Sequence, residues 1–197
     1  MRMPIYYYKI RVVKVSHRAR FSFHGNGQET IVLVLRRVTV KIQVLSYFLV
    51  SVFIFGLLTE AYVDFRQKII LDEILLVLLI AGLVYTGVSG HAWKESLMGA
   101  LTGSGLLGLI YVLSKGGMGL GDVKYAGVLG LWTGIPGVIV TLYLAFLIGG
   151  TVALMLCITH KAVRKSRIPF GPCLSAGAVF SFFYSARILD WYWSLFL

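Results

Sequence analysis

Long apolar stretches alternate with short polar or glycine-rich breaks along most of this chain. From residue 44 onward we distinguish six of them, at about residues 44–63, 69–88, 96–113, 123–135, 138–159, and from "KSRIPFGP" to about 189. About 20 apolar residues in a helix cross the hydrocarbon layer of a bilayer. The fourth stretch is shorter, and "GIPG" separates it from the fifth. The pattern predicts an all-α integral membrane protein, a compact bundle of about six transmembrane helices.

The segment before residue 44 has a different pattern. "VKVSHRARFSF" and "VTVKIQV" alternate apolar with polar residues, and "HGNGQE" between them contains an Asn-Gly pair. Alternation on both sides of such a pair is typical of a β-hairpin. We therefore predict a basic N-terminal extension over residues 1–43, with a β-hairpin of unknown role, and a membrane-embedded domain over residues 44–197.

Composition agrees with a membrane protein. Of the 197 residues, 58% are hydrophobic and only 14% are charged, whereas a soluble domain has about a quarter charged. The net charge of +11 does not require nucleic acid as a partner, because Lys and Arg beside membrane spans set topology and attract anionic lipid. Cys157 and Cys173 lie in apolar stretches without metal-ligand spacing, so they are expected to pack as small hydrophobic residues.

The distribution of Lys and Arg predicts the orientation of the bundle. If six spans alternate, the breaks near 64–68, 114–124 and 160–168 share one side and hold eight basic residues, against Lys94 alone in the short loops opposite. The basic side is then cytoplasmic. The basic extension would lie outside, against this rule. Three explanations remain open. The extension is translocated despite its charge, another interaction brings it back to the cytoplasmic side, or the true start of the protein lies after it.

Small residues recur at a spacing of four in several predicted spans. Examples are Gly99 with Gly103 and Gly130 with Gly134. Such faces let membrane helices approach closely, so they predict a tight bundle.

Two aspartates fall on the predicted cytoplasmic side. Asp64 ends the first span in "AYVDFRQKIILDE", and Asp122 follows the glycines of "KGGMGLGDVKYAG". Carboxylates that converge cannot both ionise easily, and such a pair serves as general base and general acid in aspartic proteases. Two alternatives remain open. The aspartates could form separate ion pairs with nearby basic residues, Asp64 with Arg66 or Lys68 and Asp122 with Lys124, or they could carry protons or cations in a small transporter.

Three motifs resemble the bacterial prepilin peptidases, a branch of the GxGD membrane aspartic proteases. "GMGLGDVKYAGVLGLWTG" resembles their GxGD segment, "DFRQKIILD" their first aspartate motif, and "RIPFGPCLSAGA" the Pro-Phe-Gly-Pro entry to their last helix. The resemblance implies that Asp64 and Asp122 are the catalytic pair. It also implies cleavage of the basic leader from type IV prepilin-like or pseudopilin precursors at the cytoplasmic face of the bacterial inner membrane.

Other residues are expected to contact the substrate. Gly119 and Gly121 would let an extended backbone lie close to the aspartates, and Pro169, Gly171 and Pro172 belong to the third motif. Acids near the basic face would meet the leader. These acids are Glu60, Asp72 and Glu73.

The chain departs from the family pattern in two respects. Leu71 and Asp72 stand where the first motif has proline and asparagine, and the Asp72 carboxylate is expected to cap the second span. The paired CxxC motifs of larger relatives, which also methylate the new N-terminus, do not occur here. The resemblance therefore implies the compact form without the methyltransferase segment, with no metal and no organic cofactor.

Overall fold

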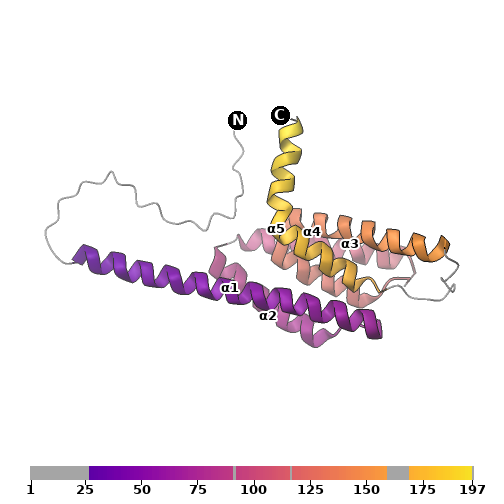
Figure 1. The fold of residues 1–197 in the computed structure, drawn as a ribbon, viewed down its shortest axis with the longest axis horizontal. Coiled ribbons are helices and arrows are strands. Elements are labelled where there is room, and N and C mark those ends of the chain that lie inside the picture. Colours follow the sequence, from indigo (N-terminus) through magenta and orange to yellow (C-terminus); the bar gives the residue numbers. More distant parts are fainter. Residues whose placement is uncertain (1–26, 91, 116, 159–168, 197) are drawn as a thin grey trace.

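The computed structural model describes residues 27–90, 92–115, 117–158 and 169–196, and all regular structure within these ranges is helical. The helices are α1 (Gly27–Gln67), α2 (Asp72–Ser89), α3 (Trp93–Leu113), α4 (Leu120–Ile158) and α5 (Gly171–Phe196). Helix α4 packs against α2, α3 and α5, and α1 packs against α2 and α5 (Figure 1). In the part that the structure describes, four helices, α1 to α4, are long and apolar enough to cross a bilayer. The all-α prediction is confirmed, and the chain is a multi-pass membrane protein.

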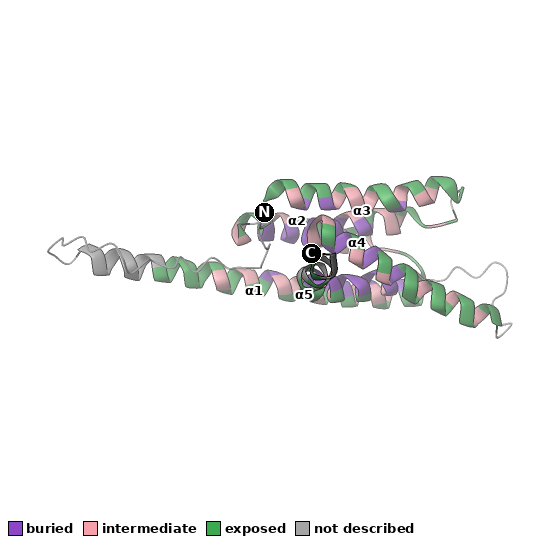
Figure 2. Cartoon of the chain, turned by 90° about the horizontal axis from the view of Figure 1, so that it is seen from above, coloured by how far each residue is buried: buried purple, intermediate pink, exposed green. Residues whose placement is uncertain are grey.

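The N-terminal part of α1 corrects one prediction. Residues 38–44, expected as the second strand of a hairpin, lie inside α1, so that expectation is wrong, while residues 13–23 of its first strand lie outside the described ranges. Extending a helix adds one hydrogen bond per residue, whereas a lone two-stranded hairpin is marginal in stability. The expected boundary at residue 44 therefore falls within a continuous helix. The N-terminal part of α1 projects beyond the bundle (Figure 1), and residues 36–48 are largely exposed (Figure 2).

Helix α4 is a hairpin of two helical segments. Gly134 leaves the helical conformation with φ 69° and ψ −177°, and Pro136 follows it. The chain reverses direction at this point, because Gly103 on α3 lies against both Ala126 before the bend and Val138 after it. The break predicted at "GIPG" is confirmed. The segment before the bend, residues 120–133, rises about 20 Å at 1.5 Å per residue and ends inside a layer of hydrocarbon about 30 Å thick.

Glycines bring α3 and α4 into backbone contact. A Cβ on Gly99 would overlap the carbonyl oxygen of Gly130, and a Cβ on Gly130 would overlap the carbonyl oxygen of Gly99. On the other side of α4, a Cβ on Gly177 of α5 would lie 2.6 Å from the carbonyl oxygen of Thr141. The prediction of close packing at small residues is thus confirmed between α3 and α4.

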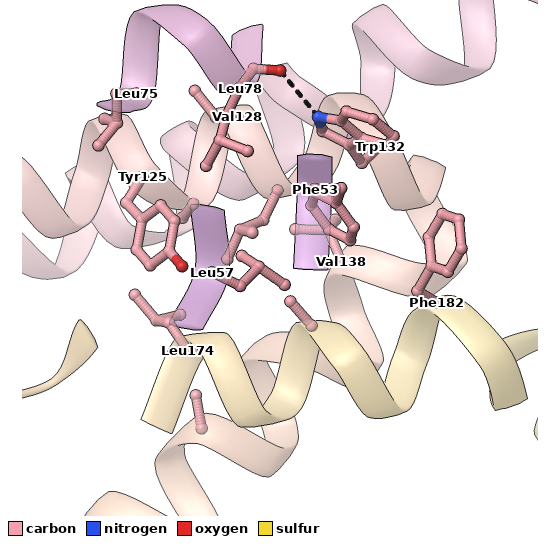
Figure 3. Close-up of a cluster of buried hydrophobic side chains, with 14 of the residues drawn as sticks. Phe53, Leu57, Leu75, Leu78, Tyr125, Val128, Trp132, Val138, Leu174 and Phe182 are labelled. Atoms are coloured by element: carbon pink, nitrogen blue, oxygen red, sulfur yellow. Dashed lines mark hydrogen bonds between the residues drawn. The ribbon is translucent and has the colours of Figure 1, made fainter. Parts of the chain in front are cut away.

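An aromatic cluster joins four helices around Trp132 of α4. Its ring stacks on Phe53 of α1 with centroids 4.3 Å apart and on Tyr85 of α2 at 5.0 Å, and it meets Phe182 of α5 edge-on. The indole N–H donates to the carbonyl oxygen of Leu78 at 2.9 Å, a bond drawn in Figure 3. The buried polar atom of the indole is therefore satisfied by the helix it packs against.

The packing of α3 on α4 can be tested at Gly99. We expect Gly99→Leu to lower the free energy of unfolding in detergent micelles by about 1–3 kcal/mol, because the side chain would overlap the α4 backbone. Gly105→Leu is the matched control on the same helix, since a Cβ there meets nothing within 4 Å. Equal stability of the two variants would show that the contact at Gly99 is not tight.

Candidate active site

Asp64 and Asp122 line the same pocket, although 58 residues separate them in the sequence. Asp64 lies in the last turn of α1 and Asp122 in the first turn of α4. The pocket has a volume of about 310 Å³ and opens at this end of the bundle. Its wall is formed by the turn between α1 and α2, the glycine segment before α4, and the two helix ends. The lining residues are Asp64, Lys68, Ile69, Ile70, Asp72, Gly119, Gly121, Asp122 and Lys124.

The Asp64 carboxylate is fixed by the first residue of α5. Its Oδ2 accepts a hydrogen bond of 2.8 Å from the backbone N–H of Gly171, and the side chain is only 5% exposed. The free N–H groups of a helix N-terminus attract negative charge. A Cβ on Gly171 would lie 2.7 Å from this same oxygen, so a glycine is needed for the carboxylate to approach. The third sequence motif therefore contributes to the site by holding Asp64.

The conformation of the chain after Asp64 places this residue at a helix end. Lys68 has a φ of 57°, in the left-handed region, and its N–H donates to the carbonyl oxygen of Asp64 at 2.9 Å. Helix α1 therefore ends one turn after Asp64, and the chain turns toward α2. Because Lys68, Ile69 and Ile70 of this turn all line the pocket, the turn shapes the space beside the carboxylate.

Two glycines give Asp122 room at the start of α4. A Cβ on Gly119 would lie 3.2 Å from Asp122 Oδ2, and a Cβ on Gly121 would lie 3.0 Å from the Cβ of Ile70. The glycine segment thus packs directly on the turn after α1. This contact brings Asp122 to the wall of the pocket that carries Asp64.

Two of the basic residues near the aspartates, Lys124 and Arg66, contact other groups. Lys124 Nζ lies 2.8 Å from both carboxylate oxygens of Asp72, and the Arg66 guanidinium lies over the ring of Tyr62 at 5.7 Å. Among the described residues, the pair of Lys124 with Asp72 is the one salt bridge found. The separate ion pairs considered from the sequence are therefore wrong for Asp122 with Lys124. For Asp64, the structure gives the Gly171 amide as partner.

The cap of α2 also differs from the expectation. The N-cap residue is Leu71, which has no side-chain cap, and Asp72 is the first residue of the helix, so the predicted capping by Asp72 is wrong. The N–H of Leu71 donates instead to Glu60 Oε1 at 3.1 Å. A proline at this position, as in the resembling motif, would have no N–H to donate.

The remaining predicted site residues lie outside the pocket. Glu60 is fully buried, Glu73 is exposed on α2, and neither lines the pocket. Pro169 and Pro172 flank the start of α5 and are half-buried. Substrate contacts by these four residues remain predictions. Gly119, Gly121 and Asp72, in contrast, do line the pocket.

Sequence reasoning missed a hydrogen-bonded chain beneath Asp64. Ser175 Oγ donates to the carbonyl oxygen of Gly171 at 2.9 Å, so the Tyr125 hydroxyl, 2.7 Å away, donates to Ser175. Tyr125 and Ser175 are both buried. Tyr125 lies one turn after Asp122 on α4, and Ser175 lies one turn after Gly171 on α5. Their spacing from the two motifs is the signal that could have identified them.

The comparison with known proteins agrees with the motifs. Residues 47–154 match the type IV leader peptidase family. The chain belongs to this family. Both aspartates lie within the matched range, whereas the α5 motif lies beyond it. In this member of the family, the matched range contains both aspartates, and α5 supplies the amide that fixes Asp64.

Curated relatives carry a common name. The chain is similar to the prepilin leader peptidase/N-methyltransferases of Bacillus subtilis (28% identity over 149 residues), Xanthomonas campestris (31% over 157 residues) and Escherichia coli (31% over 137 residues). These alignments cover 75%, 76% and 66% of this chain and 60%, 51% and 60% of the relatives. The chain therefore spans about half to three fifths of their length. No solved structure matches it.

Proposed function

We propose that this protein is a membrane aspartic endopeptidase in which Asp64 and Asp122 act as one catalytic pair. The observation that carries the proposal is the convergence of two carboxylates, from the ends of α1 and α4, on one pocket. Arg66 and Lys124 contact other groups, and the salt bridge found among the described residues does not involve either aspartate. The family and the names of its curated relatives support the same reaction.

The pair supplies general base and general acid catalysis for hydrolysis of a peptide bond. One carboxylate takes a proton from water as the water oxygen attacks the carbonyl carbon, and its protonated partner donates to the carbonyl oxygen. Collapse of the tetrahedral intermediate breaks the C–N bond and returns a proton to the leaving amine. The two aspartates titrate as a unit, so neither is base or acid by itself. The Gly171 amide holds the Asp64 carboxylate in one orientation throughout.

The proposed substrates are type IV prepilin-like or pseudopilin precursors, which the enzyme would cleave after their basic leader. The names of the relatives support this class. Gly119 and Gly121 would lie along the extended substrate backbone, because they line the pocket without side chains. Asp72, with 70% of its side chain exposed, is placed to meet a basic leader residue at the pocket edge.

We place the catalytic end of the bundle at the cytoplasmic face of the bacterial inner membrane. Arg66, Lys68 and Lys124 lie at or beside helix ends around the pocket, whereas Lys94 lies in the first turn of α3 at the other end. An excess of basic residues marks the cytoplasmic side of short loops. Six crossings follow if the two segments of α4 and helix α5 count with α1, α2 and α3. A proton- or cation-coupled transporter is the competing assignment for intramembrane aspartates.

Replacing either aspartate tests the catalytic pair. We expect Asp64→Asn and Asp122→Asn each to abolish leader cleavage of a purified precursor in proteoliposomes, and the double variant to be no worse, because one carboxylate cannot serve as an acid–base couple. Glu95→Gln at the opposite end, in the first turn of α3, is the control and should cleave normally. Near-normal cleavage by either aspartate variant would refute the assignment. Aspartate-dependent ion flux, with the precursor left intact, would identify a transporter.

A further inference from the structure

A second pocket begins where the catalytic pocket ends. It has a volume of about 650 Å³ and opens between α2, α3 and α4. Leucines make up half of its lining, and small residues lie among them. Its lining residues are Asp72, Leu75, Leu76, Leu79, Leu97, Ala100, Leu101, Ser104, Lys124, Gly127, Val128 and Leu131. We refer to this set as the leucine groove.

The leucine groove and the catalytic pocket share the Asp72–Lys124 ion pair, which lines both. From this ion pair the groove extends seven residues along α2, to Leu79, and seven along α4, to Leu131, which is about 10 Å at 1.5 Å per residue. Helices α2 and α3 both pack on α4 but hardly touch each other, so the groove stays open between them. It is therefore an apolar channel about two helical turns long that starts beside the two catalytic acids.

We propose that the leucine groove binds an apolar helical segment of the precursor that follows the cleaved bond. This proposal rests on the proposed function. A substrate whose peptide bond lies between Asp64 and Asp122 must continue along one of the surfaces that join the pocket, and the groove is continuous with it. Its length accommodates the first two turns of a helix, and its lining is mostly apolar beyond the ion pair. The Asp72–Lys124 ion pair, where the groove joins the catalytic pocket, would then face the polar backbone of the substrate near the cleaved peptide bond.

Leu101→Asn tests the groove, because this α3 residue lines it and is 71% exposed. The substrates are a full-length precursor and a short peptide that carries the leader and the cleavage site but not the apolar helix. We expect KM for the precursor to rise about tenfold, equivalent to about 1.4 kcal/mol of lost binding, with kcat unchanged and peptide cleavage unaffected. Leu109→Asn is the control on α3, exposed but outside the groove, and should keep the wild-type KM.

Ala100→Leu provides a second variant, since it fills the groove rather than making it polar. It should raise KM in the same selective way, whereas Ala176→Leu, at an exposed site on α5, should not. Wild-type KM for the precursor in both groove variants, with cleavage intact, would overturn the proposal and assign the groove to lipid acyl chains. If the wild-type protein cleaves neither substrate, the proposed function itself fails, and the groove proposal with it.

A separate observation concerns Glu60, one turn before Asp64 on α1. Its side chain is fully buried, Oε1 accepts the N–H of Leu71 at 3.1 Å, and Oε2 has no hydrogen-bond partner. Burying a carboxyl group away from water is costly, and this chain nonetheless keeps one here. The contact joins α1 to the N-cap of α2, which has no side-chain cap of its own.

We infer that Glu60 is a positioning residue that holds the wall between the two aspartates. The turn fixed by the Leu71 contact contributes Lys68, Ile69 and Ile70 to the pocket. Ile70 in turn packs on Gly121, next to Asp122. Glu60 thereby acts on both aspartates through the turn, without lining the pocket itself.

A rescue experiment separates this role from simple core filling. We expect Glu60→Leu to lower kcat for the short peptide about tenfold, because the Leu71 N–H loses its acceptor and the turn loosens. Adding Leu71→Pro should restore most of the rate, since proline has no N–H and fits the extended Leu71 backbone, whose φ is −83°. Glu60→Gln, which keeps an acceptor oxygen, should stay near the wild-type rate.

Hydrogen exchange at the Leu71 amide gives a readout that does not depend on proteolysis. We expect faster exchange in Glu60→Leu than in the wild-type protein. Unchanged protection of this amide, or a double variant no faster than Glu60→Leu in cleavage, would overturn the inference.

Discussion

The hydrogen bond from the Gly171 amide to Asp64 is the contact on which the candidate site depends. It joins residues 107 positions apart, at the end of α1 and the start of α5, and it satisfies a buried carboxylate with an N–H that α5 itself cannot use. The bond requires that α5 begin at this point and that its first residue have no Cβ. The packing of α5 against α1 and α4, and the Tyr125–Ser175 chain behind it, maintain both conditions.

The end of α1 organises the neighbouring helices through its acids. Asp64 binds the start of α5, and Glu60 binds the N-cap of α2. Asp122 approaches from the start of α4, because the glycine segment packs on the turn after α1. The site is therefore assembled from helix ends rather than from the middle of helices. The aromatic cluster around Trp132 and the α3–α4 glycine contact provide the rigid support for those ends.

Much of this arrangement could be predicted from the sequence, because the information is local. Apolar stretches of spanning length predict helices, "GIPG" predicts the break in α4, and counting spans places Asp64 and Asp122 at the same end of the bundle, where both line one pocket. The long-range partners could not be predicted. Lys124 lies near Asp122 in sequence but pairs with Asp72, 52 residues away, and nothing local relates Gly171 to Asp64. The hairpin prediction failed because residues 38–44 extend a long helix, which gains one hydrogen bond per added residue, whereas a lone two-stranded hairpin is marginal in stability.

Cleavage kinetics of Gly171→Ala test the central claim most directly, because the added methyl group would lie 2.7 Å from Asp64 Oδ2 and force this carboxylate to move. We expect the folded variant to show an unchanged KM for a prepilin-like precursor and a kcat lowered about 100-fold or more, since small displacements of a catalytic group have effects of this size. Gly150→Ala on α4, where a Cβ meets nothing within 4 Å, should leave both constants unchanged. Wild-type kcat in folded Gly171→Ala would contradict the claim that this amide holds Asp64 in a catalytic position.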